Sequence, residues 1–216
     1  MIKVYYAYTE YVAEAELNEL VKPLSEQVKS RLAGFKKEED RLLLLTASYL
    51  LKEALAKNGY PDYRLKNLQY TQAGKPFFPG SPFDFSISHT DYCAAVAFST
   101  NCRVGIDIEK IKTVDLADFK TVFPEEVWTE IETSVEPTET FYSHWTLLES
   151  AVKADGRGLP LLSSNHVKVK DGQVIINGKR WFSQHLSFDP SISCCIASGL
   201  KQETVELIEI KPIYKG

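Results

Sequence analysis

Apolar residues recur at two periods along the chain, and each period predicts one kind of secondary structure. Helical spacing predicts helices over 13–32 with a break at Pro23, over 37–57, from Pro124 onward and over 138–155. Short apolar runs bounded by turn residues predict strands near 2–8, 83–88, 92–98, 103–109, 166–170, 173–177, 180–188, 191–197 and 203–210. The segment over 73–83 holds two glycines and three prolines and is therefore expected to form a loop.

The order of these elements places helices beside mostly antiparallel strands in both halves of the chain, which indicates an α+β fold. The pairs Asp171-Gly172 and Asn177-Gly178 are typical of hairpin turns and support antiparallel pairing in the second half. A polar stretch at 99–101 predicts a boundary near residue 100. We therefore expect two halves, 1–100 and 101–216, that resemble one another only in this general style.

Composition excludes several classes of protein. The 216 residues are 44% hydrophobic and 25% charged, which is typical of a globular protein with its own core. A net charge of -4 argues against non-specific binding to nucleic acid. The start lacks an apolar signal segment, the apolar runs are too short to span a membrane, and the four cysteines lack C-x-x-C spacing. We expect a reduced, cytoplasmic protein that binds neither nucleic acid nor membrane.

The predicted strand over 103–109 carries an unusual pair of acids. Side chains alternate along a strand, so Asp107 and Glu109 share the face opposite Val104, Ile106 and Ile108. Two acids about 7 Å apart repel, and a divalent cation such as Mg²⁺ converts that repulsion into coordination. A solvated outer face that is acidic by chance explains the same pattern, and the spacing alone leaves both interpretations open.

The predicted helix over 138–155 offers a third carboxylate. Glu149 and Lys153 lie one turn apart and project together, and Glu149 sits at the edge of the apolar stripe. The alternative is an ordinary exposed ion pair, which contributes about 0.3–0.5 kcal/mol.

A further polar group combines Lys75 with Ser88 and His89, whose short donors suit a phosphate. Its alternative interpretation is a polar hairpin turn.

Three segments follow one another along the chain: 85–90 (FSISHT), 105–109 (GIDIE) and 145–159 (WTLLESAVKADGRGL), preceded by GKP at 74–76. Their joint occurrence in this order is a more specific signal of function than any one of them alone. Together they resemble the motifs of the Sfp-type 4′-phosphopantetheinyl transferases. The resemblance implies two similar α+β halves in pseudo-twofold arrangement, with the active site at their junction. It also implies transfer of the phosphopantetheine arm of coenzyme A to a serine of an acyl or peptidyl carrier protein, with release of adenosine 3′,5′-bisphosphate.

The resemblance also implies roles for particular residues. Asp107, Glu109 and Glu149 match the acids that bind Mg²⁺, with Mn²⁺ as a possible substitute, and Glu149 or a water it holds takes the serine proton. Lys153 neutralises the phosphates or protonates the leaving oxygen. The residues matching the coenzyme A pocket are Lys75, Ser88 and His89, with a looser match for Lys29 and Arg31. The segment 111–123 corresponds to the carrier docking region, where Phe119, Val122 and Phe123 are either contacts or core.

Two departures from the family pattern stand out. Leu148 replaces the basic residue that often precedes the helix glutamate, and Leu43 stands where an arginine usually follows Asp40. The nearby Arg41 lies about 200° around the helix from that position, so its role in nucleotide binding is in doubt. These departures favour one alternative to catalysis of transfer, a non-catalytic relative that binds carrier proteins or coenzyme A. A second alternative is an unrelated magnesium phosphohydrolase that uses the same acids. Enzymes of this type and length are often monomers, and we expect a monomer here.

Overall fold

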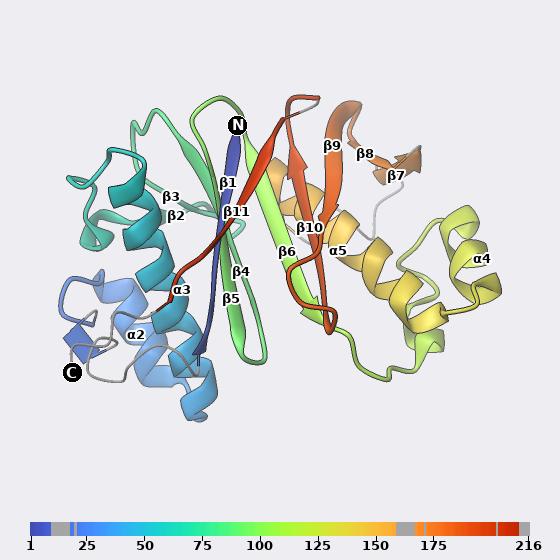
Figure 1. Ribbon diagram of the computed structural model, residues 1–216, viewed down its shortest axis with the longest axis horizontal. Helices are drawn as coiled ribbons and strands as arrows, with labels where there is room; N and C mark the ends of the chain where they lie inside the picture. The colour runs from blue at the N-terminus through green and yellow to red at the C-terminus, as the bar shows by residue number, and fades with distance from the viewer. Residues whose placement is uncertain (10–17, 20, 159–166, 171, 202, 212–216) are drawn as a thin grey trace.

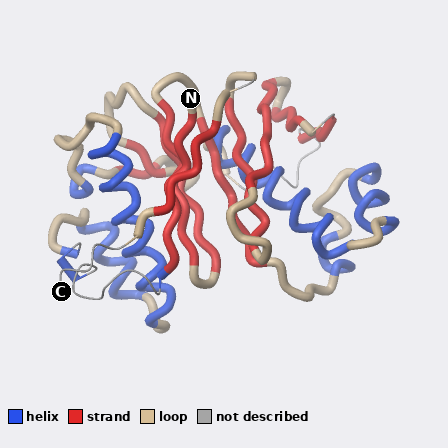
Figure 2. The backbone as a smooth tube through the Cα atoms, in the orientation of Figure 1, coloured by secondary structure: helices blue, strands red, loops and turns tan. Residues whose placement is uncertain are grey.

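Two β-sheets lie between two groups of helices, so that the order of layers is helix, sheet, sheet, helix (Figures 1 and 2). The computed structural model describes residues 1–9, 18–19, 21–158, 167–170, 172–201 and 203–211. The mixed α+β fold expected from the sequence is confirmed. None of the helices that the structure describes combines the length and apolar character needed to cross a membrane.

The first sheet has four strands in the order β11-β1-β5-β4. Their bounds are β1 (Ile2–Tyr8), β4 (Asp84–Thr90), β5 (Cys93–Ser99) and β11 (Val205–Glu209). The helices α2 (Glu26–Gly34) and α3 (Glu38–Lys57) pack on one face through a core that includes Leu50, Leu51 and Phe85. Beside them lie a short 3₁₀ helix, η2 (Leu65–Asn67), and a two-stranded sheet of β2 (Gln69–Tyr70) and β3 (Pro76–Phe77).

The second sheet has five antiparallel strands in the order β6-β10-β9-β8-β7. They are β6 (Val104–Lys110), β7 (Val167–Lys170), β8 (Gln173–Ile176), β9 (Lys179–Leu186) and β10 (Ile192–Ser198). The helix α5 (Pro137–Asp155) covers its outer face, α4 (Glu125–Thr133) packs against α5, and a 3₁₀ helix, η3 (Leu116–Phe119), precedes both. The inner faces of the two sheets meet in a third core that includes Ile2, Val4, Ile106 and Ile108.

Most expected elements are confirmed, and the exceptions are instructive. The break at Pro23 is real, because α2 begins at Glu26 with Ser25 as its N-cap; the first part of the helix expected over 13–32 lies outside the described residues. The strand expected over 83–88 continues through Thr90, so the turn that leads into β5 lies at Asp91 and Tyr92. The expected loop over 73–83 contains β3. The strand expected over 203–210 pairs in parallel with β1 and so joins the first sheet.

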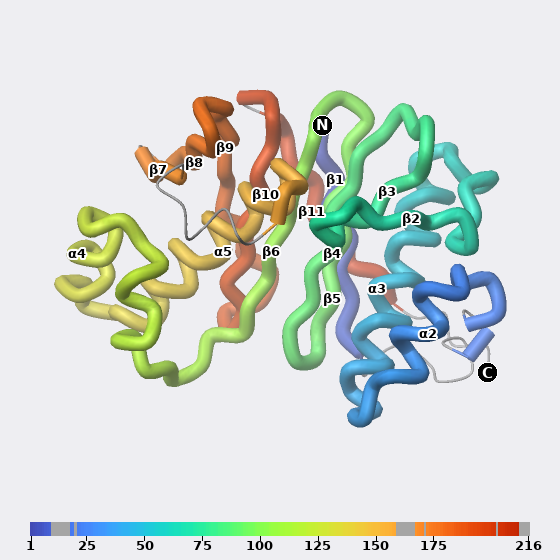
Figure 3. The backbone as a smooth tube through the Cα atoms, turned by 180° about the vertical axis from the view of Figure 1, so that it is seen from behind, coloured from blue at the N-terminus to red at the C-terminus, as the bar shows by residue number. Residues whose placement is uncertain are grey.

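The edge of β6 that faces away from β10 is joined to β4 by side chains. Every second backbone N–H of β6 donates to a β4 side chain: Val104 to Asp84 Oδ2 at 2.8 Å, Ile106 to Ser86 Oγ at 3.1 Å, Ile108 to Ser88 Oγ at 3.3 Å and Lys110 to Thr90 Oγ1 at 2.9 Å. Side chains on one face of a strand and N–H groups on one edge both recur every two residues, so the four contacts stay in register. β4 and β6 therefore lie side by side, as Figures 1 and 3 show from opposite sides.

Helix α5 lies directly against β6 because Gly105 has no side chain. A Cβ placed on Gly105 would lie 2.0 Å from the Ser150 carbonyl oxygen and 2.4 Å from the Ala154 nitrogen. Both of these atoms belong to the α5 backbone, so they cannot move aside as a flexible side chain would. The close approach brings residues 149 and 153 of α5 to the side of β6 that carries Asp107.

We expect Gly105→Ala to destabilise the protein by about 3 kcal/mol or more, because the whole of α5 must shift to accept one methyl group. The matched control is Gly34→Ala, where an added Cβ meets nothing within 4 Å. That control should change the free energy of unfolding by less than about 1 kcal/mol. Urea unfolding followed by circular dichroism measures both, and equal stabilities of the two variants would contradict the close approach.

Candidate active site at the junction of the two sheets

Asp107 lies in the middle of β6 and is the most buried acid of the junction. Its side chain is 2% exposed, because α5 and β4 cover the face of β6 that it shares with Glu109. Its Oδ1 atom accepts a hydrogen bond from Ser88 Oγ at 2.9 Å and lies 2.5 Å from Lys153 Nζ. Its Oδ2 atom is buried and has no hydrogen-bond partner among the described residues. The interpretation of this face as solvated and acidic by chance is therefore wrong for Asp107.

Lys153 supplies the positive charge at the junction. Its ammonium group contacts Asp107 Oδ1, donates to Ser88 Oγ at 3.0 Å and lies 3.9 Å from Glu149 Oε2. Burial opposes the charge on Lys153, but the carboxylates of Asp107 and Glu149 outweigh burial, so that the pKa of Lys153 is raised. The Glu149–Lys153 pair is thus part of a partly buried charge cluster and is not an isolated pair on the helix surface.

The two glutamates hold their protons more tightly than an ordinary carboxyl. Burial first, and then the nearby Asp107 charge, raise the pKa of Glu109 and of Glu149 from 4.5 to about 7. Lys153 opposes this rise for both, and a hydrogen bond from the Trp145 side chain opposes it further for Glu109. Three carboxyl groups thus compete for one lysine, and the cluster lacks positive charge.

The acids suit a hard divalent cation. Among the described residues, acids, histidines and cysteines do not form a ready-made metal cluster of three, and the cation that Asp107 contacts is the Lys153 ammonium. The donor set nevertheless fits Mg²⁺, because carboxylate oxygens are its preferred ligands and Asp107 Oδ2 is a buried oxygen without a partner. Asp107 Oδ2 is therefore the oxygen here that is best placed to bind such an ion, with Glu109 and Glu149 as neighbouring acids.

Lys75 is engaged inside the protein. Its ammonium group lies 2.8 Å from Asp84 Oδ2 and donates to the Val104 carbonyl at 3.1 Å, with only 8% of the side chain exposed. Burial lowers the pKa of Lys75, although the Asp84 carboxylate opposes that effect. Lys75 thus connects the loop before β3 to both β4 and β6. Its partner Asp84 was not identified from the sequence, although it is the first of the alternating polar residues in DFSISHT.

His89 lies on the opposite face of β4, toward α2 and α3. Burial, together with the charges of Lys153 and Arg31, lowers the pKa of His89 from 6.5, so the ring is neutral at pH 7 until an anion approaches. A cavity on this face is lined by Arg31, Tyr70 and His89, and the Arg31 guanidinium lies 5.9 Å from the centre of the Tyr70 ring. Tyr70 was missed by sequence reasoning, because a lone tyrosine before a glycine-rich loop gives no signal.

A second cavity opens on the other side of the same loop. It has a volume of about 230 Å³ and is lined by Lys75, Ser86, Glu149 and Lys153, among others. The two cavities share Gly74, Pro76 and Ile87 as wall residues. A long ligand lying across the loop can therefore contact His89 and Arg31 at one end and the Glu149–Lys153 cluster at the other.

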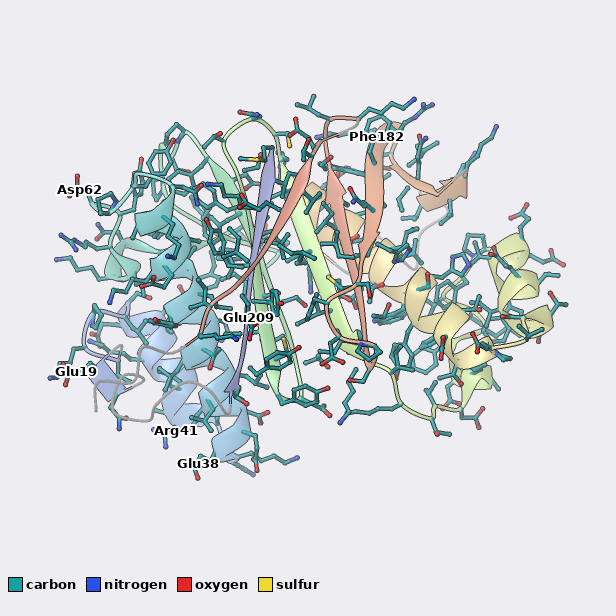
Figure 4. The ribbon with its side chains drawn as sticks, in the orientation of Figure 1. Glu19, Glu38, Arg41, Asp62, Phe182 and Glu209 are labelled. Carbon is teal, nitrogen blue, oxygen red and sulfur yellow. The ribbon has the colours of Figure 1, made fainter. Side chains whose placement is uncertain are left out.

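Two basic residues proposed from the sequence lie apart from this group. Lys29 forms an ion pair with Glu26 at 2.8 Å on the surface of α2. Arg41 is exposed near the start of α3, on the outer side of the helical layer close to Glu38 in Figure 4. Neither lines either cavity among the described residues, whereas Leu44 and Ser48 of α3 line the first.

The aromatic residues after β6 pack inside the second half. Phe123 is 6% exposed, and its ring lies 5.8 Å from that of Phe141. Phe119 is half-buried and contacts Phe141 and Trp145. Phe123 is thus a core residue, while Phe119 and Val122 lie partly at the surface. Leu148, which stands where the family often has a basic residue, is 1% exposed and belongs to the core.

Comparison with known proteins gives a consistent result. Residues 103–197 match the family model described as the 4′-phosphopantetheinyl transferase superfamily. The chain is 30% identical over 181 residues to the 4′-phosphopantetheinyl transferase Sfp of Bacillus subtilis (strain 168), covering 81% of this chain and 80% of the relative. It is 31% identical over 133 residues to 4′-phosphopantetheinyl transferase gsp of Aneurinibacillus migulanus, covering 56% and 54%.

The raised pKa of Glu149 predicts a pH-dependent loss of stability in metal-free protein. The folded state binds this proton more tightly than the unfolded chain, so stability falls as the pH rises from 4.5 to about 7. Because glutamine carries no charge, we expect Glu149→Gln to exceed the wild type by about 1–2 kcal/mol at pH 8, and by much less at pH 5. Urea unfolding in chelator at both pH values measures this difference.

The matched control is Glu139→Gln, an exposed acid on the same helix. It should leave the free energy of unfolding unchanged at both pH values. A Glu149→Gln variant that is less stable than the wild type at pH 8 would show that Glu149 gains more from Lys153 than it loses by burial.

Proposed function

The chain belongs to the 4′-phosphopantetheinyl transferase superfamily, and we propose that its sheet junction transfers the phosphopantetheine arm of coenzyme A to a serine of an acyl or peptidyl carrier protein. The observation that carries this proposal is the cluster of Asp107, Glu149 and Lys153 at the end of a cavity whose other wall belongs to the Gly74–Pro76 loop. Acids and a lysine together suit a diphosphate, which needs both a bridging cation and a direct positive contact.

The two cavities offer a path for coenzyme A. In this arrangement His89 and Arg31 meet the phosphate groups on the helical side of β4, where Arg31 supplies positive charge and the neutral His89 ring can donate a hydrogen bond. Lys75 lines the second cavity, Ser88 accepts a hydrogen bond from the Lys153 ammonium group, and in this proposal the diphosphate lies toward Lys153. Lys29 and Arg41 reach the nucleotide only as outer charges, because both project from the surface of the helical layer.

The transfer is a displacement at phosphorus. The carrier serine oxygen forms a new bond to the phosphorus that bears the pantetheine arm, and the bond to the adenosine 3′,5′-bisphosphate oxygen breaks. Lys153, charged at neutral pH, lies where it can neutralise the phosphates or protonate the leaving oxygen. Glu149, or a water it holds, accepts the serine proton.

The metal site proposed for this reaction consists of Asp107, Glu109 and Glu149. Mg²⁺, or Mn²⁺ in its place, supplies charge stabilisation at the diphosphate when bound. The protein holds the three acids near one another. This arrangement is unfavourable for the charged carboxylates, which is why the pKa values of Glu109 and Glu149 are raised.

We further propose that residues 1–100 and 101–216 are two related halves in pseudo-twofold arrangement, with the active site between them. The support is the symmetric order of layers and the joining of the halves through β4 and β6. Strand β11 crosses this division, because it comes from the second half and pairs with β1. We propose that the enzyme acts as a monomer, since both cavities are built from one chain.

The direct test is to incubate the protein with coenzyme A, Mg²⁺ and a panel of apo carrier proteins, followed by intact-mass measurement. We expect the mass of the phosphopantetheine arm to appear on at least one carrier, to disappear with chelator and to return with added Mg²⁺ or Mn²⁺. Carrier or coenzyme A binding without transfer would instead identify a non-catalytic relative. Phosphate release without a carrier would identify a phosphohydrolase.

Asp107→Asn should lower the rate of transfer by at least about 100-fold, because it removes the negative charge that the proposed metal site needs and that pairs with Lys153. Circular dichroism should show the fold retained. The matched control is Asp91→Asn, which removes an exposed acid paired with Lys112 at 2.6 Å, outside both cavities. That variant should transfer at the wild-type rate, and equal rates for the two variants would remove Asp107 from the mechanism.

A further inference from the structure

The Ser88 hydroxyl uses all of its hydrogen-bonding capacity within the protein. A serine hydroxyl has one donor and two acceptor lone pairs. Ser88 Oγ donates to Asp107 Oδ1 at 2.9 Å, and it accepts from Lys153 Nζ at 3.0 Å and from the Ile108 N–H at 3.3 Å. The residue is 5% exposed. A phosphate group could gain a hydrogen bond from Ser88 only if the bond to Asp107 were broken.

We infer that Ser88 is a positioning residue for Asp107 and Lys153 and does not bind the phosphates of coenzyme A. This inference rests on the proposed function and concerns the same site. Ser88 Oγ, Asp107 Oδ1 and Lys153 Nζ form a triangle with sides of 2.9, 3.0 and 2.5 Å. The triangle fixes one carboxylate oxygen and leaves the other, Oδ2, free to accept a cation.

The backbone explains why this serine can hold that geometry. The Ile108 N–H that donates to Ser88 belongs to the residue directly after Asp107, so one hydroxyl contacts both the acid and the adjoining main chain. Thr90 and Ser86, its neighbours on the same face of β4, bond only to main-chain N–H groups in the hydrogen bonds described for them. Ser88 thus bonds both to the main chain of β6 and to the charged side chains of Asp107 and Lys153.

A positioning role and a binding role predict different kinetics. If Ser88 orients Asp107 and Lys153, Ser88→Ala lowers kcat by about 10–100-fold and leaves the KM for coenzyme A within about twofold. Calorimetry in chelator should likewise give a coenzyme A affinity within about twofold of the wild type. A loss of affinity of more than tenfold with kcat retained would overturn the inference and make Ser88 a phosphate ligand.

The matched control is Thr90→Val, which also removes one acceptor for a β6 N–H but touches neither Asp107 nor Lys153 in its described hydrogen bonds. Both variants lose a comparable contact between the sheets, so any effect on folding is shared. Thr90→Val should keep kcat within about twofold. A fall in kcat equal to that of Ser88→Ala would show that the serine acts only through the sheet contact.

A double-mutant cycle tests the geometry without any measurement of activity. Ser88→Ala and Lys153→Met should together raise the unfolding equilibrium constant about tenfold less than the product of their separate effects. A cycle of Thr90→Val with Lys153→Met should give coupling within about twofold of unity. A wild-type protein that transfers nothing would refute the proposed function, whereas an uncoupled Ser88–Lys153 cycle would refute the positioning role.

Discussion

The structure depends on how the open edge of β6 is satisfied. An unpaired strand edge exposes N–H groups that must find acceptors, and a second strand is the usual partner. Here the partners are the side chains of Asp84, Ser86, Ser88 and Thr90, which project from the face of β4. A face of one sheet thus meets an edge of the other, which fixes the register and the angle between the two sheets. Asp107 lies at that contact, so the same packing fixes the position of its carboxylate.

Charge balance is the second constraint on the site. The fold brings three carboxyl groups and one ammonium group together at a partly buried site, and this excess of negative charge, together with burial, raises the pKa of both glutamates. Gly105 makes this crowding possible, because it lets α5 approach β6 at backbone distance. The excess of negative charge destabilises the folded protein. The same excess favours binding of a positively charged partner, because that partner relieves the repulsion.

Local pattern predicted much of this arrangement. The alternation in VGIDIE placed Asp107 and Glu109 on one face, and the helical spacing of Glu149 and Lys153 placed them on one side of α5. Contacts between distant segments were beyond that reasoning. The Lys75–Asp84 pair, the stack of Arg31 on Tyr70 and the burial of Ser88 depend on how strands pack, and hydrophobic period carries no information about such contacts. The same limit applies to Arg41, whose direction on α3 follows from the register of the helix against the sheet.

The pairing of β11 with β1 has a consequence for synthesis of the chain. Ile2–Tyr6 align with Val205–Glu209, so β1 is synthesised long before the strand that closes its outer edge. Until then that edge is an unpaired template on a nascent polypeptide, in a topology with a very long loop between partners. Completion of the first sheet thus depends on synthesis of β11, and a chain cut short before residue 205 would carry an open edge of the kind that recruits other strands.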